Sequence, residues 1–218
     1  MALKRFVQSR ASEYRLEKLI ASRLVEGADR TAIDERIWNL FGEEWCVMFT
    51  DLAGFSRNVA RYGIIHFLQT IYESQRLLIP IIDQHDGILL KTEGDSFLVL
   101  FRKADRGLVC AQEMQSVLRE YNQSHAPEDQ IHLCVGLGYG PMLKIGDLDV
   151  FGAEVNAASK LGEDTAGPGE IIVTESLRQA LDPDLAAAIP LQKLDVQPPG
   201  ASGAWLLPAD LTTPDING

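Results

Sequence analysis

The sequence contains no run of about 18 apolar residues, so a membrane-spanning helix is not expected. Its first 25 residues, MALKRFVQSRASEYRLEKLIASRLV, lack the apolar segment of a secretory signal peptide. Cysteine is scarce, and Cys46, Cys110 and Cys134 stand far apart in apolar segments that are typical of a protein core. These absences argue against a disulfide framework and predict a soluble, reduced, cytoplasmic protein.

Positive charge is in deficit, because 20 Lys and Arg face 31 Asp and Glu and the net charge is −11. A broad interface with nucleic acid needs excess Lys and Arg, so no nucleic-acid partner is expected. The four histidines show no metal-ligand spacing, which argues against a zinc site. A small anionic ligand would therefore need metal ions or a local basic cluster. With 46% hydrophobic residues, the 218-residue chain has enough apolar material for one core plus extensions.

Residues 1–44 are predicted to form a helical extension, because apolar residues such as Leu16, Leu19, Ile20 and Leu24 are interleaved with Lys and Arg at a spacing that looks helical. The segment GADRTAID interrupts this pattern, and Asp29 or Thr31 is expected to cap a second helix. A helix that packs or dimerises is the favoured interpretation. A basic helix that contacts a membrane surface or a partner is the alternative.

From Trp45 onward the pattern predicts an α+β domain over residues 45–208. Short apolar segments predict strands, and apolar residues at helical spacing predict helices, in the order strand 45–51, helix 64–83, strands 88–91 and 96–101, helix 108–121 and strand 131–140. This order is the βαββαβ core of the ferredoxin-like fold. A hairpin, a helix over about 153–161 and further strands at 170–174 and 205–207 are expected to follow, and residues 209–218 are predicted as a flexible tail.

Two carboxylates occupy special places in this core. Asp51 ends the first strand, and Asp95 opens the third strand after the tight turn TEGD. The first and third strands of this fold are adjacent and antiparallel, so the two side chains are expected to meet at one edge of the sheet. Paired carboxylates repel unless a cation lies between them, and Mg²⁺ or Mn²⁺ prefers such oxygen ligands. The pair therefore predicts a divalent metal site, with two metals as the arrangement suited to phosphoryl chemistry.

The loop LAGF after Asp51 supports an anion-binding site. Gly54 lets backbone N–H groups approach a phosphate, and Phe55 is predicted to contact the substrate beside it. A glycine in a loop after a strand is common in any fold, so this feature adds to the carboxylate pair without deciding the function.

Three segments together resemble the catalytic domain of class III adenylate and guanylate cyclases: FTDLAGFS, LLKTEGDSFLVLF and DVFGAEVNAASKL. The resemblance covers about residues 45–205. It implies that Asp51, Asp95 and the Leu52 carbonyl bind the two metal ions. It further implies that Lys91 and Asp149 read the base.

In the same way, the resemblance implies that Asn156 orients the ribose and that Lys160 stands where an arginine stabilises the transition state. Lys91 and Asp149 are the adenylate-type residues, since Lys can donate to adenine N1 and Asp can accept from the exocyclic amine. ATP is therefore the expected substrate. Asn156 and Lys160 lie four residues apart and are expected to share a helix face.

The chain departs from the family pattern at three positions. Lys160 keeps the charge of the family arginine but not its bidentate fork. Pro141 replaces an arginine after the fourth strand, with Lys144 nearby, and Gln197 occupies the place of a phosphate-binding lysine. These departures concern substrate contacts and leave the metal pair unchanged.

The resemblance also implies a homodimer in which each site is shared, with Asp51 and Asp95 from one protomer and the remaining residues from its partner. The expected activity is the conversion of a nucleoside triphosphate to its 3′,5′-cyclic monophosphate, a second messenger. Three alternatives remain open: a UTP or CTP cyclase of an antiphage signalling system, a diguanylate cyclase with EGDSF in place of GGDEF, and an inactive nucleotide-binding sensor or interaction module.

Overall fold

The computed structural model describes residues 10–208, and of residues 55–58 it describes the backbone only. Its elements follow one another as α1 (Ala11–Arg23), α2 (Arg30–Phe41), β1 (Gly42–Leu52), α3 (Phe55–Tyr62), α4 (Ile64–Gln84), β2 (Ile88–Glu93), β3 (Ser96–Phe101), α5 (Ala104–Gln123), β4 (Leu133–Ile145), β5 (Asp149–Phe151), α6 (Ala153–Ser159), the π-helix η1 (Lys160–Thr165), β6 (Ile171–Thr174), α7 (Glu175–Ala180), α8 (Pro183–Ala188), β7 (Gln192–Leu194) and β8 (Ala204–Leu207).

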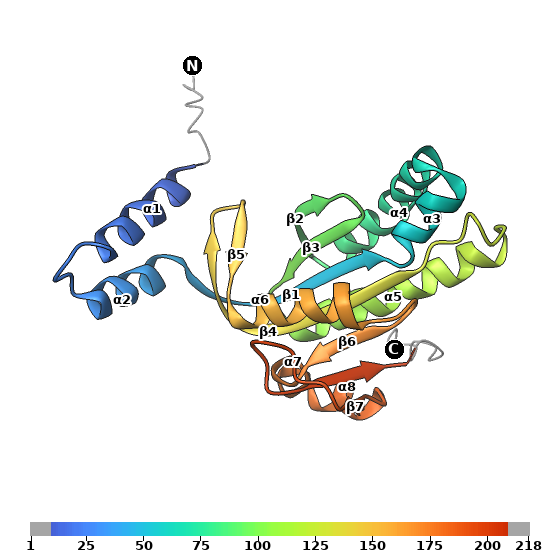
Figure 1. Cartoon of the computed structure of the whole chain (residues 1–218). Helices are drawn as coiled ribbons and strands as arrows, with labels where there is room; N and C mark the ends of the chain where they lie inside the picture. The colour runs from blue at the N-terminus through green and yellow to red at the C-terminus, as the bar shows by residue number, and fades with distance from the viewer. Residues whose placement is uncertain (1–9, 209–218) are drawn as a thin grey trace, which may run out of the picture.

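The strands form one eight-stranded sheet in the order β2-β3-β1-β4-β6-β8-β7, with β5 paired to β4 off this path. β1 lies between β3 and β4 and is antiparallel to both, while β6 runs parallel to β4. This arrangement confirms the predicted α+β fold with a βαββαβ core and a C-terminal addition. Figure 1 shows α6 in front of the sheet and α5 behind it.

The two faces of the sheet have separate cores, because alternate residues of each strand point to opposite sides. On one face, Met48 and Val99 pack with residues of α4 and α5 such as Leu78. On the other, Val47 packs with Val155 of α6. The three cysteines are buried and free, as their apolar surroundings predicted.

Glycines on β4 let α6 lie directly on the second face. A Cβ atom at Gly136 would lie 2.1 Å from the Ala158 carbonyl oxygen, and one at Gly138 would lie 2.7 Å from the Glu154 carbonyl oxygen. Only glycine permits this approach of helix backbone to strand backbone. The segment GLGYG therefore fixes how closely α6 and its side chains approach the sheet.

Two elements differ from the sequence prediction. The segment after Asp51 was expected to be a loop, but α3 begins at Phe55, directly after Gly54 with its left-handed φ of 86°. The helix expected over about 153–161 ends at Ser159 and continues as η1. Gly162 lies against β1 and β4 there, since its Cβ would be 2.8 Å from the Phe49 carbonyl oxygen. This close contact lies in η1, where the chain has changed from the α-helical turn to the wider π-helical turn. Such contacts leave no periodic signal in a sequence.

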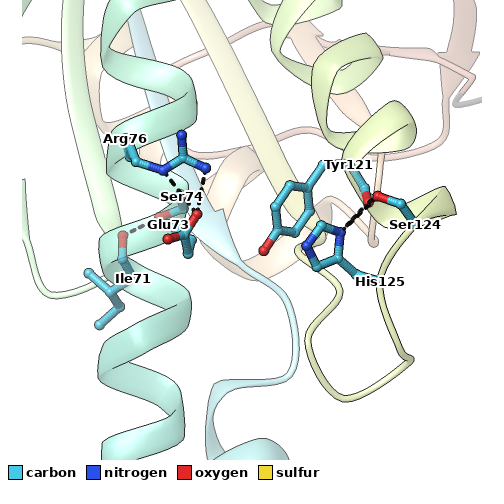
Figure 2. A network of polar contacts seen from close by, with 7 residues as sticks. All are labelled: Ile71, Glu73, Ser74, Arg76, Tyr121, Ser124 and His125. Carbon is cyan, nitrogen blue, oxygen red and sulfur yellow. Dashed lines mark hydrogen bonds and ion pairs between the residues drawn. The ribbon is translucent and has the colours of Figure 1, made fainter.

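The helices α4 and α5 carry polar contacts on the side turned away from the sheet (Figure 2). Arg76 donates to the Glu73 carboxylate from Nε and Nη2, at 3.0 and 2.7 Å. The rings of Tyr121 and His125 stack with centroids 3.7 Å apart. These contacts lie within single helices or at their ends, on the opposite face of the sheet from Lys91.

The first two helices form a pair beside the sheet. Asp29 caps α2 by accepting from the Ala32 N–H, as one of the two predicted capping residues, and Arg23 joins α1 to α2 through Asp34. Across the part of the chain that the structure describes, no helix is both long and apolar enough to cross a membrane.

Candidate active site

Asp51 and Asp95 meet at one edge of the sheet, as the strand order predicted. The Ser96 hydroxyl donates to Asp51 Oδ1 at 3.2 Å. Asp95 Oδ2 is buried and has no hydrogen-bond partner among the described residues. A buried, unpartnered carboxylate oxygen costs stability, so its place beside a second carboxylate fits a cation-binding role.

Electrostatics at this edge are unfavourable to two negative charges. Burial raises the pKa of Asp51, and the charge of Asp95 raises that pKa further. Burial also raises the pKa of Asp95, against the stabilising effect of backbone hydrogen bonds, one of them from Leu52. A divalent ion would reverse both effects by favouring the ionised forms.

A β-bulge in β2 turns the Lys91 side chain to the face of the sheet that α6 covers. Leu89 pairs with Val99 and Lys91 pairs with Leu98, so Leu90 is the extra residue. Without the bulge Leu90, and not Lys91, would oppose Leu98. The lysine Nζ donates to Asp149 Oδ2 at 2.7 Å, which joins β2 to β5. The structure thus brings together the two residues predicted to read the base.

The Lys91–Asp149 pair opens into a cavity of about 240 Å³, here called the base cavity. Its walls include apolar side chains from three strands and α6, among them Phe49, Leu98, Val150 and Val155. Its charged lining is one lysine against the carboxylates of Glu93, Asp149 and Glu163. An apolar cavity with net negative lining suits a nucleobase better than a triphosphate.

Asn156 and Lys160 lie on the surface of α6 and at the start of η1. The Lys160 N–H still bonds to the Asn156 carbonyl, so the two residues keep the predicted helical spacing. Lys160 Nζ donates to Asp164 at 2.6 Å, and this carboxylate raises the pKa of Lys160. Asp164 is also near enough to raise the pKa of Asp51 slightly, which places η1 close to the carboxylate pair of the same chain.

The remaining predicted positions have simpler surroundings. Gly54 is exposed at the start of α3, and the Phe55 side chain lies outside the described residues. Pro141 is exposed on β4 opposite Glu44, and Gln197 is exposed in the segment between β7 and β8. Lys144 lies three residues after Pro141, which stands where the family pattern has an arginine. It donates to the Gly146 carbonyl within its own turn.

Sequence reasoning missed Ser96 and Glu163. Ser96 follows Asp95 directly and faces Asp51 across β1 and β3, so strand register gives a signal for it. Glu163 accepts from Ser159 at 3.0 Å and reaches the base cavity from η1. Its position depends on the π-helix, for which the sequence contains no signal.

The model of the adenylate and guanylate cyclase catalytic domain matches residues 42–207. The chain belongs to the adenylate and guanylate cyclase family. Its domain is therefore that of the nucleotidyl cyclases, which are phosphorus–oxygen lyases. The match begins with β1 and ends with β8, so α1 and α2 lie outside it.

Curated relatives share this domain within longer proteins. The serine/threonine-protein kinase pkn2 of Myxococcus xanthus is 31% identical over 144 residues, 66% of this chain and 17% of the relative. Guanylate cyclase D of Mus musculus is 26% identical over 83% of this chain and 18% of its own length. The chain thus spans less than a fifth of the length of these relatives.

Solved structures of cyclase domains share the fold. An adenylate/guanylate cyclase/hydrolase from Silicibacter pomeroyi superposes with a TM-score of 0.65 at 24% identity, over 76% of this chain and 96% of that one. The guanylyl cyclase Cya2 gives 0.63 at 21% identity, over 76% and 90%.

Proposed function

We propose that this protein is a nucleotidyl cyclase that converts a nucleoside triphosphate to its 3′,5′-cyclic monophosphate and pyrophosphate. In this reaction the 3′-oxygen forms a bond to the α-phosphorus, the bond from that phosphorus to the pyrophosphate oxygen breaks, and the 3′-hydroxyl proton is released. The observation that carries the proposal is the Asp51–Asp95 pair, in which the charge of Asp95 acts on Asp51 and one buried Asp95 oxygen has no partner among the described residues.

Asp51 and Asp95 would hold two divalent cations, Mg²⁺ or Mn²⁺, and the Leu52 carbonyl is the further proposed ligand. When bound, such ions neutralise the triphosphate and stabilise the charge that develops on the attacking and leaving oxygens. Among the described residues no third His, Cys, Asp or Glu completes a cluster with them. Two carboxylates plus substrate phosphates are a usual environment for Mg²⁺.

ATP is the substrate that the base cavity favours. Lys91 can donate to a ring nitrogen, and Asp149 can accept from an exocyclic amine, as adenine requires. Guanine presents the reverse pattern and would leave both groups unmatched. The second candidate is a pyrimidine triphosphate, because cytosine also presents a ring acceptor and an amine, and because no lysine or arginine stands at Pro141 or Gln197.

Asn156 would orient the ribose and Lys160 would stabilise the transition state, with Gly54 and Phe55 beside the phosphates. Asn156 and Lys160 are exposed in the single chain, which supports a homodimer in which a partner completes each site. A guanylyl cyclase domain from the fungus Blastocladiella emersonii, of similar fold, has been described as a non-canonical dimer.

The test is product identification with the purified full chain. ATP, GTP, CTP and UTP are each incubated with Mn²⁺, and the products are identified by mass. A cyclic mononucleotide, formed fastest from ATP, is expected. A cyclic product from CTP or UTP alone would support the pyrimidine alternative. Absence of any cyclic product with all four would refute the enzyme proposal, and nucleotide binding without turnover would identify a sensor.

A further inference from the structure

Asp149 lies on a part of the sheet with little support from neighbouring strands. β5 has three residues and pairs with the end of β4. Leu143 still pairs with Gly42 of β1, and beyond it residues 144–151 form a two-stranded ribbon off the main strand order. Figure 1 shows this β4–β5 ribbon projecting from the sheet beside α1 and α2. An isolated two-stranded ribbon is at best marginally stable in water, so other contacts must hold Asp149 against Lys91.

The α1–α2 helix pair supplies those contacts. Leu19 of α1, Ile37 and Phe41 of α2 and Ile145 of the ribbon are all buried in one apolar cluster, and Leu143 packs against it. Ile145 directly opposes Asp149 in the ribbon, so the two side chains share a face. The face that carries Asp149 is therefore the face that the helix pair covers.

A second cavity confirms this closeness. It has a volume of about 390 Å³ and lies between α1 and the ribbon. Glu13 and Glu17 of α1, and Arg10 directly before it, line this cavity together with Lys91 and Asp149. The Lys91–Asp149 pair thus separates the base cavity from a cavity whose far wall is α1.

We propose that the α1–α2 helix pair, which lies outside the family domain, is a positioning element for base recognition. It holds the ribbon so that Asp149 stays against Lys91, and loosening it lowers discrimination among nucleobases. This inference rests on the proposed function, because discrimination presupposes a nucleotide in the base cavity. Asp149 contacts the base, whereas Leu19, Ile37 and Phe41 act through the ribbon.

The test compares, in the full chain, Leu19 of α1 with Leu24, which directly follows α1. Leu19→Ala removes a side chain that is 4% exposed and packs on the ribbon side, while Leu24→Ala removes one that is 76% exposed. Amide hydrogen exchange is measured for residues 144–151 and, as an internal reference, for β1 and β3. In parallel, kcat/KM is measured with all four nucleoside triphosphates.

For Leu19→Ala, we expect exchange in the ribbon to rise about tenfold with β1 and β3 unchanged. The ratio of kcat/KM between the best and second-best triphosphate should fall about tenfold. Leu24→Ala should match the wild type in both measurements. A purely structural role would slow all triphosphates equally and leave this ratio intact.

Unchanged exchange in the ribbon of Leu19→Ala, or an equal effect from Leu24→Ala, would overturn the positioning role. If Leu19→Ala does not fold, Ile145→Val is measured instead, and a smaller increase in ribbon exchange is expected. If ribbon exchange does not increase in Ile145→Val, the proposal is overturned. If the wild type makes no cyclic product, the proposed function fails, and the exchange comparison still decides whether the helix pair holds the ribbon.

Discussion

At the scale of single residues, the carboxylate edge is built at a cost to stability. The folded state raises the pKa of Asp95 by burial, so it disfavours the ionised form. Because the folded-state pKa is raised, the contribution of this carboxyl group to stability is fully present below its unfolded pKa and is lost as pH rises through its folded pKa. Such a cost is expected where charge is reserved for a ligand and not for the fold.

Asp95→Asn should therefore stabilise the metal-free protein at neutral pH, raising Tm by about 2 °C or more. The difference should disappear as pH falls, when Asp95 is protonated in both states. Added Mn²⁺ should raise the Tm of the wild type and not of the variant. Asp83→Asn, at an exposed site on α4, serves as the control. A variant less stable than the wild type at pH 7 without metal would contradict this view of the site.

Lys160 is expected to matter for rate and not for stability. Its side chain is 56% exposed, and its ion pair with Asp164 is a surface pair of small energetic value. Lys160→Ala should lower kcat by about 10- to 100-fold with Tm unchanged, while Lys160→Arg should keep most activity. Steady-state kinetics with Lys103→Ala as control test this. Wild-type kcat in Lys160→Ala would remove the residue from the reaction.

At the scale of elements, the C-terminal strands depend on one carboxylate. Glu175, the first residue of α7, accepts from Arg178, Gln179 and the Trp205 indole of β8. The bond from Arg178 is the main cause that lowers the pKa of Glu175 from 4.5 to about 2, with Trp205 and Gln179 contributing. This contact joins α7 to the β7–β8 hairpin at the far edge of the sheet.

Glu175→Gln should destabilise the protein by about 1–3 kcal/mol at neutral pH. A lowered folded-state pKa gives stability that is present above the unfolded value and lost as pH falls. The difference in free energy of unfolding between wild type and variant should therefore shrink as pH falls from about 4.5 to about 2. Urea denaturation across this range, with Glu120→Gln as control, measures it. A gap that is constant with pH would show that the charge of Glu175 is not responsible.

The elements also show what a sequence can and cannot predict. Apolar periodicity and turn residues were sufficient to predict the core strands and the helices α4 and α5. Together with the strand order, they also predicted that Asp51 meets Asp95. The bulge at Leu90 and the π-helix at Lys160 follow from strand register and backbone contact across the sheet, which leave no local pattern. The placement of Glu163 in the base cavity could not be foreseen for the same reason.

At the scale of the whole molecule, residues 1–44 were predicted as a helical extension, but their packing was not. The contact of Leu19 and Ile37 with Ile145 joins residues more than a hundred positions apart, and amphipathic spacing does not specify which surface a helix covers. The division at residue 44 stays a prediction, as does the tail at 209–218, which lies outside the described residues.

Shared sites in a homodimer lead to a complementation prediction. Mixing Asp51→Asn with Asn156→Ala protein should restore about a quarter of wild-type activity, because half of the dimers are mixed and each has one intact site of two. Mixing Asp51→Asn with Asp95→Asn should restore none, since both changes fall in the same half-site. No recovery at any ratio in the first mixture would place the whole site within one chain.

The most direct test of the central claim compares cyclic mononucleotide formation by the wild type and by Asp51→Asn, with the preferred triphosphate and saturating Mn²⁺. The wild type should release one pyrophosphate for each cyclic monophosphate. The variant, folded by its Tm, should be slower by at least about a thousandfold, because it loses the charge that holds the metal ions. Equal rates in the two proteins would contradict a reaction centred on the Asp51–Asp95 pair.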